Sequence, residues 1–202
     1  MNKTLLIILA VIIGGLVLWS IPSDTDDHYA DTILAERKEK DTFMNEDKNS
    51  PFLGMTDSVV ALKYFPPEPH YRVIADLETI EQKKVVQLPT STGATVQYLE
   101  FAWAIFDLDG TTYRLLIFEV MDMGPTRGQL FLAFADATSA GETYGAGRYL
   151  DLKKVRAATT IELDFNKAYN PYCAYNDQYS CPLPPRENLL PIPIPAGEKA
   201  FH

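Results

Sequence analysis

The stretch between residues 95 and 120 constrains the fold of this chain more than any other. It reads TVQYLEFAWAIFDL, then Asp109-Gly110, then TTYRLLIFEV. Alternating apolar residues are typical of half-buried strands, and Asp-Gly is a strong signal for a tight hairpin turn with positive φ. We therefore predict a β-hairpin that joins strands at 95–108 and 111–120. One face of the first strand is expected to carry Leu99, Phe101, Trp103 and Ile105.

Shorter strand candidates flank this hairpin. They lie at residues 71–77, 84–88, 129–135 and 159–165. Short strands at near-regular spacing, separated by turn residues, favour an antiparallel sandwich or a partly open barrel. The predicted fold is therefore mainly β, with a β domain at residues 51–202 that follows two N-terminal segments.

The first of these segments is an apolar run at residues 4–21, TLLIILAVIIGGLVLWSI. As a helix it would span roughly 27 Å, close to the hydrocarbon core of a bilayer. Lys3 precedes the run and Asp24 follows it, so the positive-inside tendency predicts that the following domain is exported. We predict that residues 1–22 are a single-pass transmembrane signal anchor in the bacterial inner membrane, with the domain extracytoplasmic. Because residues 18–23 match a cleavage site only poorly, a cleaved signal peptide and a secreted domain are the alternative.

The second segment, residues 23–50, is predicted to be an acidic helical stalk. It contains nine acidic and four basic residues, and so carries −5 of the −9 charge of the chain. Apolar residues at helical spacing predict a short helix at 30–44 that lies against the domain and separates it from the membrane. The acidic balance of the whole chain argues against nucleic acid as a partner.

The segment at residues 140–151 contains Gly145, Gly147 and Arg148. The glycines resemble part of a phosphate-binding loop, but the following RYLDLKKV reads as a strand rather than the helix that such a loop needs. One interpretation is a concave wall in which Arg148, near Tyr144, binds a carboxylate or a phosphate. The other is a bulge where two backbones approach closely.

The most irregular segment is residues 164–188, which contains both cysteines, four asparagines, four tyrosines and four prolines. In an exported protein Cys173 and Cys181 are most simply a disulfide, which would contribute about 2.5 kcal/mol for so short a loop. Two sulfurs are only half of a tetrahedral zinc site, and a nucleophilic cysteine would need His70 as its base. We predict no metal and no cofactor. The proline-rich tail is expected to pack as an extended strap on an edge strand.

These two segments supply the candidate ligand-binding residues. They are Tyr144, Gly145, Gly147, Arg148, Asp164, Asn166, Asn170 and Tyr175. No catalytic constellation is recognisable. The leading hypothesis is a binding or interaction module of the cell envelope, with a small molecule or an envelope protein as its partner. The alternatives are an enzyme with a pocket around Arg148 and Asn170, and a purely structural role in which both segments stabilise the sheet.

Several motifs occur in an order that resembles a known family. They are YFPPEPHYRV at 64–73, TSTG at 90–93, LFLAFADATSAGETYGAGRYLD at 130–151, LDFNKAYNPYCAYNDQYSCPLPPREN at 163–188 and AGEKAF at 196–201. Together they closely resemble bacterial domain-of-unknown-function family 1684 over residues 37–201. The resemblance implies that residues 145–148 and 166–181 belong to the shared core of the domain, and it implies no activity or cofactor. Ala146 departs from the family pattern, which more usually has glycine at that position.

Overall fold

The structure is a computed structural model that describes residues 24–53 and 60–202. The signal anchor predicted at residues 1–22 therefore lies outside the described residues. Within those two ranges, no helix is both long enough and apolar enough to cross a membrane.

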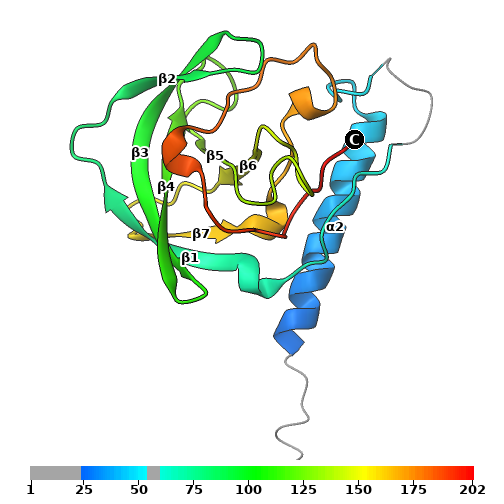
Figure 1. The fold of residues 1–202 in the computed structure, drawn as a ribbon, viewed down its shortest axis with the longest axis horizontal. Coiled ribbons are helices and arrows are strands. Elements are labelled where there is room, and N and C mark those ends of the chain that lie inside the picture. Colours follow the sequence, from blue (N-terminus) through cyan, green and yellow to red (C-terminus); the bar gives the residue numbers. More distant parts are fainter. Residues whose placement is uncertain (1–23, 54–59) are drawn as a thin grey trace, which may run out of the picture.

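The described chain consists of one long helix, seven strands and four single-turn 3-10 helices (Figure 1). The long helix is α2, Asp24–Glu46. The strands are β1 (Arg72–Thr79), β2 (Val85–Pro89), β3 (Thr95–Leu108), β4 (Thr111–Val120), β5 (Leu130–Phe134), β6 (Arg148–Leu152) and β7 (Thr160–Asp164). The 3-10 helices are η1 (Pro69–Tyr71), η2 (Phe165–Lys167), η3 (Tyr172–Ala174) and η4 (Arg186–Asn188).

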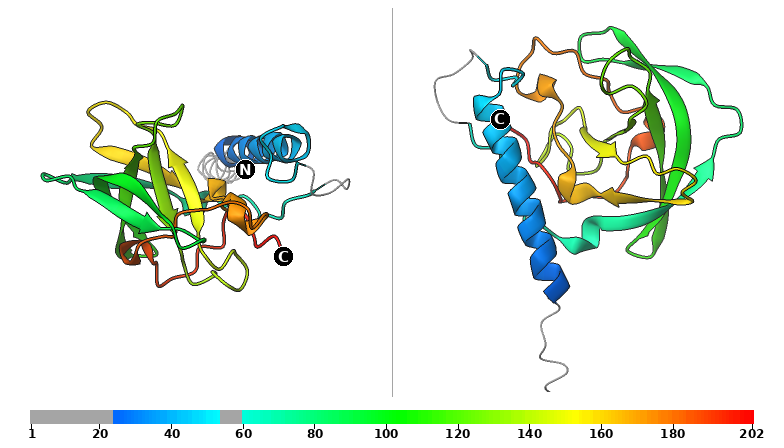
Figure 2. Two further views of the ribbon diagram at one scale, coloured as in Figure 1. Left: turned by 90° about the horizontal axis from the view of Figure 1, so that it is seen from above. Right: turned by 180° about the vertical axis from the view of Figure 1, so that it is seen from behind.

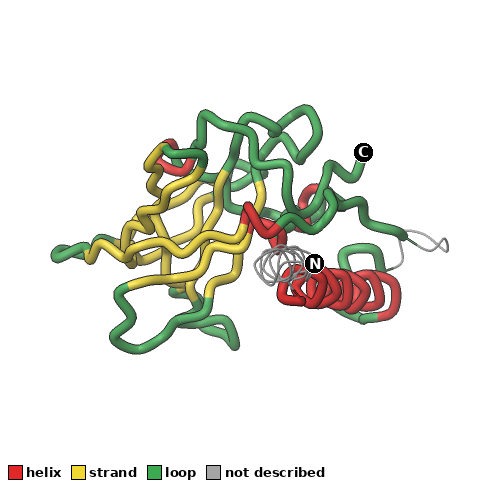
Figure 3. Tube along the Cα trace, turned by 90° about the horizontal axis from the view of Figure 1, so that it is seen from below, coloured by secondary structure: helices red, strands yellow, loops and turns green. Residues whose placement is uncertain are grey.

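All the strands belong to one antiparallel sheet. Its order is β6-β5-β4-β3-β1-β7, and β2 is attached to β3. The sheet curls into a half-barrel, with β6 and β7 at its two ends (Figure 1). The strands gather on one side of the molecule and α2 lies beside them, viewed nearly along its axis in Figure 3. The prediction of a mainly β, partly open antiparallel barrel is confirmed, and the sandwich alternative is not what forms.

The predicted hairpin is confirmed, but the face of its first strand is not the one expected. Asp109 and Gly110 have φ values of 51° and 74°, as the tight turn requires. The buried residues of β3 are Tyr98, Ala102, Ala104, Phe106 and Leu108, whereas Leu99, Phe101, Trp103 and Ile105 are only partly buried. A bulge between Glu100 and Ala102 shifts the register. The sheet also curls toward its concave side, where space is limited. The small side chains of the alanines fit into this crowded interior.

The C-terminal tail forms the predicted strap, but it packs beside an internal strand rather than an edge strand. β4 and β5 pair only at Phe118–Phe131 and Glu119–Leu130, so the rest of β5 has no partner on that side. The strap enters this gap, where Leu189 forms a parallel bridge with Ala135 just after β5. Leu190, Ile194 and Ala196 of the strap are then buried in the core.

One side chain of the strap completes the sheet at this point. Asn188 is fully buried. It accepts a hydrogen bond from the Leu116 N–H at 2.7 Å and donates to the carbonyls of Leu116 and Ala133 at 2.9 and 2.8 Å. Its amide thus replaces backbone pairing where β4 and β5 separate, because buried backbone groups must be hydrogen-bonded.

The helix α2 is longer than the predicted 30–44, and it packs against the β domain. Ile33 and Met44 are buried against the domain. Lys40 pairs with Glu198, and Lys167 pairs with Glu36. As Figure 2 shows from two further directions, α2 lies alongside the segment that follows β7.

Candidate functional site

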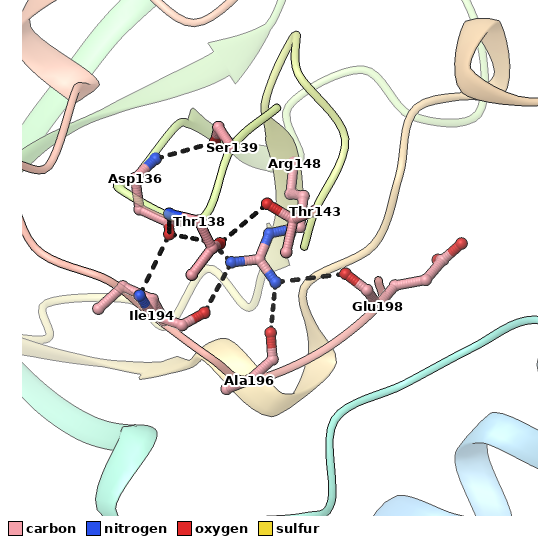
Figure 4. Close-up of polar contacts among 8 residues, drawn as sticks. All are labelled: Asp136, Thr138, Ser139, Thr143, Arg148, Ile194, Ala196 and Glu198. Carbon is pink, nitrogen blue, oxygen red and sulfur yellow. Dashed lines mark hydrogen bonds and ion pairs between the residues drawn. The ribbon is translucent and has the colours of Figure 1, made fainter. Parts of the chain in front are cut away.

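Arg148 lies in a closed polar cluster rather than on the wall of a pocket (Figure 4). Its side chain is fully buried, and its guanidinium forms a 2.8 Å ion pair with Asp136. The guanidinium also donates hydrogen bonds to the carbonyls of Ile194, at 2.9 Å, and Ala196. The other oxygen of Asp136 accepts hydrogen bonds from the Thr138 N–H and hydroxyl and from the Ile194 N–H. We call these five residues the arginine cluster.

The arginine cluster joins the loop after β5 to the C-terminal strap. Desolvation lowers the pKa of Arg148, and the charge of Asp136 acts in the opposite direction. A guanidinium without solvent access cannot bind a ligand carboxylate or phosphate. The prediction of a ligand-binding wall at Arg148 is therefore wrong, because the strap provides the oxygen atoms that a ligand would have provided.

The glycines next to Arg148 serve this packing. Gly147 has a φ of +89°, and a Cβ built on it would lie 2.5 Å from the Phe134 carbonyl oxygen and 2.6 Å from Pro184 Cγ. The interpretation as a close approach of two backbones is thus correct for Gly147. Gly145 is exposed. Ala146 is only partly buried and is not among the residues with positive φ, so its methyl group is accommodated.

Asn166 and Asp164 form a second set of structural contacts. The Asn166 side chain accepts a hydrogen bond from the Glu68 N–H and donates to the Glu68 carbonyl, both at 2.8 Å. Asp164 accepts hydrogen bonds from the Asn166 N–H at 3.1 Å and from the Tyr29 hydroxyl at 2.8 Å. These contacts connect the end of β7 with η1 and with α2.

Asn170 and Tyr175 converge on a buried carboxylate, Glu198. Glu198 is 1% exposed and accepts a 2.9 Å hydrogen bond from the Asn170 amide and another from the Tyr175 hydroxyl. Its other oxygen pairs with Lys40 at 2.8 Å. Asn170 also donates to the Lys199 carbonyl at 2.8 Å. Arg148 donates to the Glu198 carbonyl at 3.4 Å, so both side chains bind the strap at Glu198, and both are fully buried.

Cys173 and Cys181 are free thiols in the structure, which gives the predicted disulfide no support. The Cys173 N–H donates a 3.2 Å hydrogen bond to the Cys181 sulfur. A hydrogen bond from the Cys181 thiol lowers the pKa of Cys173 to about 6, and the same interaction raises the pKa of Cys181. The Tyr144 hydroxyl lies 3.8 Å from the Cys173 sulfur. The two cysteines are thus close together without a covalent bond between them. Among the described residues, no group of three or more His, Cys, Asp and Glu side chains could hold a metal ion.

One open space lies between α2 and the segment that follows β7. It has a volume of about 570 Å³. Aromatic and apolar side chains make up most of its lining: Tyr64, Tyr149, Tyr169, Tyr172, Tyr179, Ile33, Phe43, Met44, Ala168, Pro171 and Pro182. Polar and charged side chains at its wall include Glu36, Arg37, Lys40, Asp151, Asn166 and Lys167. We call this space the tyrosine hollow.

Strand β6 positions one wall of the tyrosine hollow. Side chains of a strand alternate between two faces, so Tyr149 and Asp151 point to the hollow while Arg148 and Leu150 point to the other side. The backbone of Tyr149 pairs with that of Tyr169 at 2.9 and 3.1 Å. This pairing brings the Tyr169 hydroxyl to Asp151, to which it donates a 3.0 Å hydrogen bond.

The tyrosine rings meet one another at their edges. The rings of Tyr149 and Tyr169 are 5.9 Å apart and nearly perpendicular. Tyr172 and Tyr179 form a second perpendicular pair at 5.2 Å. Ring pairs in this geometry are mutually attractive, so the aromatic wall is held in place without a ligand.

Charged groups in the tyrosine hollow differ in how completely they are paired. Arg37 donates to the carbonyls of Phe65 and Asn166 at 2.7 and 3.2 Å. Lys40 is paired with Glu198, as described above. Asp151 takes part in none of the ion pairs found among the described residues, and it is an exposed residue of β6 that lines the hollow. Burial raises the pKa of Asp151, while the Tyr169 hydrogen bond and the charge of Lys40 oppose the rise.

Of the residues predicted from the sequence, Asn166 and Cys181 line the tyrosine hollow. None of the other predicted residues lines the hollow. They are Tyr144, Gly145, Gly147, Arg148, Asp164, Asn170, Tyr175 and Cys173. The sequence reasoning missed Lys40, Tyr149, Asp151 and the three tyrosines Tyr169, Tyr172 and Tyr179. The tyrosine count in residues 164–188 was a usable signal, because three of those four tyrosines face the hollow.

Comparisons with known proteins agree with the family resemblance. The family described as "Protein of unknown function (DUF1684)" matches residues 58–199. The solution NMR structure of an uncharacterized protein of Haloarcula marismortui is similar, with 40% sequence identity and a TM-score of 0.66. The similarity covers 89% of this chain and 97% of that chain. A search of curated proteins gave no match.

Proposed function

The chain belongs to the DUF1684 family, and we propose that this member is a small-molecule binding module whose site is the tyrosine hollow. The observation that carries the proposal is the hollow itself, about 570 Å³ in volume and lined mainly by aromatic and apolar side chains. Ligand sites in proteins commonly have volumes of about 300–1,000 Å³ with such a lining and a few convergent polar groups. A perturbed carboxyl group within such a space, here Asp151, is a further property of functional sites.

The arrangement favours binding over catalysis. Most polar groups of the hollow already serve the fold: Arg37 binds backbone carbonyls, Lys40 binds Glu198 and Asn166 binds Glu68. Asp151 and the tyrosine rings remain to contact a ligand. Flat or branched apolar groups suit this lining, because edge-to-face aromatic contacts add to the burial of apolar surface.

Indole, a neutral aromatic probe, tests the proposal. We expect indole to shift the backbone NMR signals of Tyr149, Tyr169 and Tyr172 in the full chain, held in detergent micelles. The variant Tyr172→Ala should weaken indole binding by about tenfold, through the loss of ring contacts and buried area. The matched control is Tyr113→Ala, which removes a partly buried tyrosine of β4 that is not part of the hollow.

Two outcomes would contradict the proposal. If indole shifts signals elsewhere on the domain, or if Tyr113→Ala weakens binding as much as Tyr172→Ala, the tyrosine hollow is not the binding site.

We further propose that the domain is held at the extracytoplasmic face of the bacterial inner membrane by residues 1–22, as a module of the cell envelope. The uncharged 18-residue run of the sequence supports this location, and its length suits a bilayer. Cell fractionation of the full chain and of a variant lacking residues 1–22 tests it. Only the full chain should enter the membrane fraction. Recovery of the full chain from the cytosol would refute the anchor, whereas a mature N-terminus near residue 23 would favour secretion after cleavage.

A further inference from the structure

The charges of the tyrosine hollow leave one acidic group without a counter-ion. Lys40 and Arg37 are bonded to Glu198 and to backbone carbonyls. At the rim, Lys167 pairs with Glu36 at 2.6 Å. Asp151, by contrast, has only the Tyr169 hydroxyl as a hydrogen-bond donor among the described residues.

Two lysines that are close to Asp151 in the sequence form no ion pair with its carboxylate. Lys153, two positions further along the chain, forms no ion pair with Asp151, and Lys154 pairs with Glu119 at 2.7 Å. Desolvation of a carboxylate that has no ion-pair partner is unfavourable, and it raises the pKa of Asp151, although the charge of Lys40 opposes part of that rise. A ligand that carries a positive charge would remove this cost.

The aromatic rings around Asp151 also suit a cation. The faces of tyrosine rings attract ammonium groups, and quaternary ammonium ligands are commonly bound by clusters of aromatic rings. One ring of the hollow already does this, because the Lys40 ammonium lies 4.8 Å from the centre of the Tyr169 ring. Tyr64, Tyr149, Tyr172 and Tyr179 are the other tyrosines that line the hollow.

An apolar wall faces these rings. Ile33, Phe43 and Met44 of α2 contribute to it. The hollow therefore has a charged group, Asp151, and an apolar surface that the body of a ligand can contact. An anionic ligand would be less suitable, because it would have to compete with Glu198 for Lys40 and would meet Asp151 without a compensating cation.

We infer that the tyrosine hollow binds an organic cation, an amine or quaternary ammonium compound with an apolar or aromatic body, whose charge lies beside Asp151. The inference rests on the proposed function and deepens it by naming the class of ligand. The ammonium group contacts the tyrosine rings and the carboxylate, and the body packs against α2.

Three probes of similar shape separate charge from shape. They are benzyltrimethylammonium, the neutral neopentylbenzene and the anionic phenylmethanesulfonate. With the full chain in nonionic detergent, NMR titration measures the affinity of each probe and locates it by the signals of the lining residues. We expect the cation to bind at the hollow roughly tenfold more tightly than the neutral probe, and the anion to bind more weakly than both.

The variant Asp151→Asn keeps the shape of the side chain and removes its charge. It should weaken binding of the cation by about tenfold and leave the affinity of the neutral probe unchanged. The matched control is Asp177→Asn, at an exposed aspartate of the same irregular segment that does not line the hollow. That control should change neither affinity.

The result that overturns the inference differs from the result that overturns the proposed function. If the neutral probe binds at the hollow as tightly as the cation, or if Asp151→Asn leaves the affinity for the cation unchanged, the hollow is not selective for cations although it remains a binding site. If none of the three probes shifts signals of the lining residues, both the inference and the proposed function fail.

Discussion

The arginine cluster and the tyrosine hollow lie on opposite faces of the same strand. Arg148 and Asp151 are three positions apart in β6, yet the side chain of Arg148 has no solvent exposure while Asp151 is open to the hollow. The ion pair and carbonyl contacts of Arg148 are all supplied by the chain itself. Asp151 accepts one hydrogen bond, from the Tyr169 hydroxyl, and takes part in no ion pair within the described part of the chain.

This difference separates a stabilising polar cluster from a binding site. A buried ion is tolerated only when its partners are in place, and the strap supplies those partners to Arg148. Asp151 stays accessible at a cost to stability, and such costs are typical of positions that serve function. In this molecule, incomplete pairing is a better indicator of a site than the presence of glycines and an arginine.

The largest expected effect comes from Arg148→Met, which keeps an apolar stem and removes the guanidinium. Asp136 would then remain buried without its cation, so we expect a loss of about 3–5 kcal/mol in the free energy of unfolding. Urea denaturation measures it. The same change at the exposed Arg156 should alter stability by less than about 0.5 kcal/mol.

Preserved stability in Arg148→Met, together with lost binding of the probes, would reverse the comparison. Arg148 would then belong to the binding site and not to the stabilising cluster.

A somewhat smaller effect is expected for Asn188→Ala. The substitution leaves three buried backbone groups of Leu116 and Ala133 unpaired where β4 and β5 separate, and we expect a loss of about 2–3 kcal/mol. Hydrogen exchange at the Leu116 amide should accelerate. Gln97→Ala, at an exposed position of β3, is the control and should change stability little. Unchanged exchange at Leu116 would mean that the strap does not complete the sheet.

Unlike the two preceding variants, Asp151→Asn is expected to increase the free energy of unfolding slightly. The pKa of Asp151 is raised in the folded state, so its contribution to stability is present at low pH and is lost as pH rises through that raised pKa. At neutral pH the ionised group is therefore destabilising, and the variant should be slightly more stable. Solvent screening at this accessible position keeps the gain below about 1 kcal/mol. Comparison of urea midpoints at acidic and neutral pH measures it, and a destabilised variant would contradict the comparison.

The same titration predicts how binding of the cationic probe depends on pH. The charged and titratable groups around Asp151 are Tyr169 and Tyr149 beside it, Lys40, Arg37 and Glu36 on α2, Lys167 at the rim and Lys153 further along the chain. Affinity for benzyltrimethylammonium should fall as pH decreases through the pKa of Asp151. In Asp151→Asn this dependence should disappear, and its persistence would point to another group.

The smallest expected effect concerns the two thiols. Because the pKa of Cys173 is lowered to about 6, one thiolate per chain should be present at neutral pH. Its contribution to stability is present above the pKa of an unfolded cysteine and is lost as pH falls through the lowered pKa. Ultraviolet absorbance of the thiolate measures the titration, and Cys173→Ser should abolish it. An absence of thiolate at neutral pH, or a mass lower by two hydrogen atoms under non-reducing conditions, would contradict the free-thiol arrangement.

The sequence predicted the local parts of the fold well. The Asp109-Gly110 turn and the two strands around it depend on short-range alternation and on positive φ, which the residues themselves determine. The buried face of β3 was misassigned because a bulge at Glu100 changes the register, and no residue nearby signals that bulge. The position of the strap beside β5 was missed because it depends on the short pairing of β4 with β5, which involves only two residue pairs.

The candidate site was predicted less well, for a physical reason. Lys40, Tyr149 and Tyr169 are far apart in the sequence, and only the packing of α2 against the end of the barrel brings them together. Gly147 and Arg148 looked functional because glycine and buried arginine are as necessary to tight packing as to ligand binding. Composition could indicate that tyrosines gather in residues 164–188, but not which face they occupy.

The helix α2 has a consequence for how such a binding site can change over time. It supplies one wall of the hollow but precedes residues 58–199, which match the family. Substitutions on its inner face, for example at Phe43, would alter the shape of the hollow without disturbing any strand. An engineer could therefore vary the inner face of α2 to change which compounds the protein recognises, while the strand pairing of the barrel stays as it is.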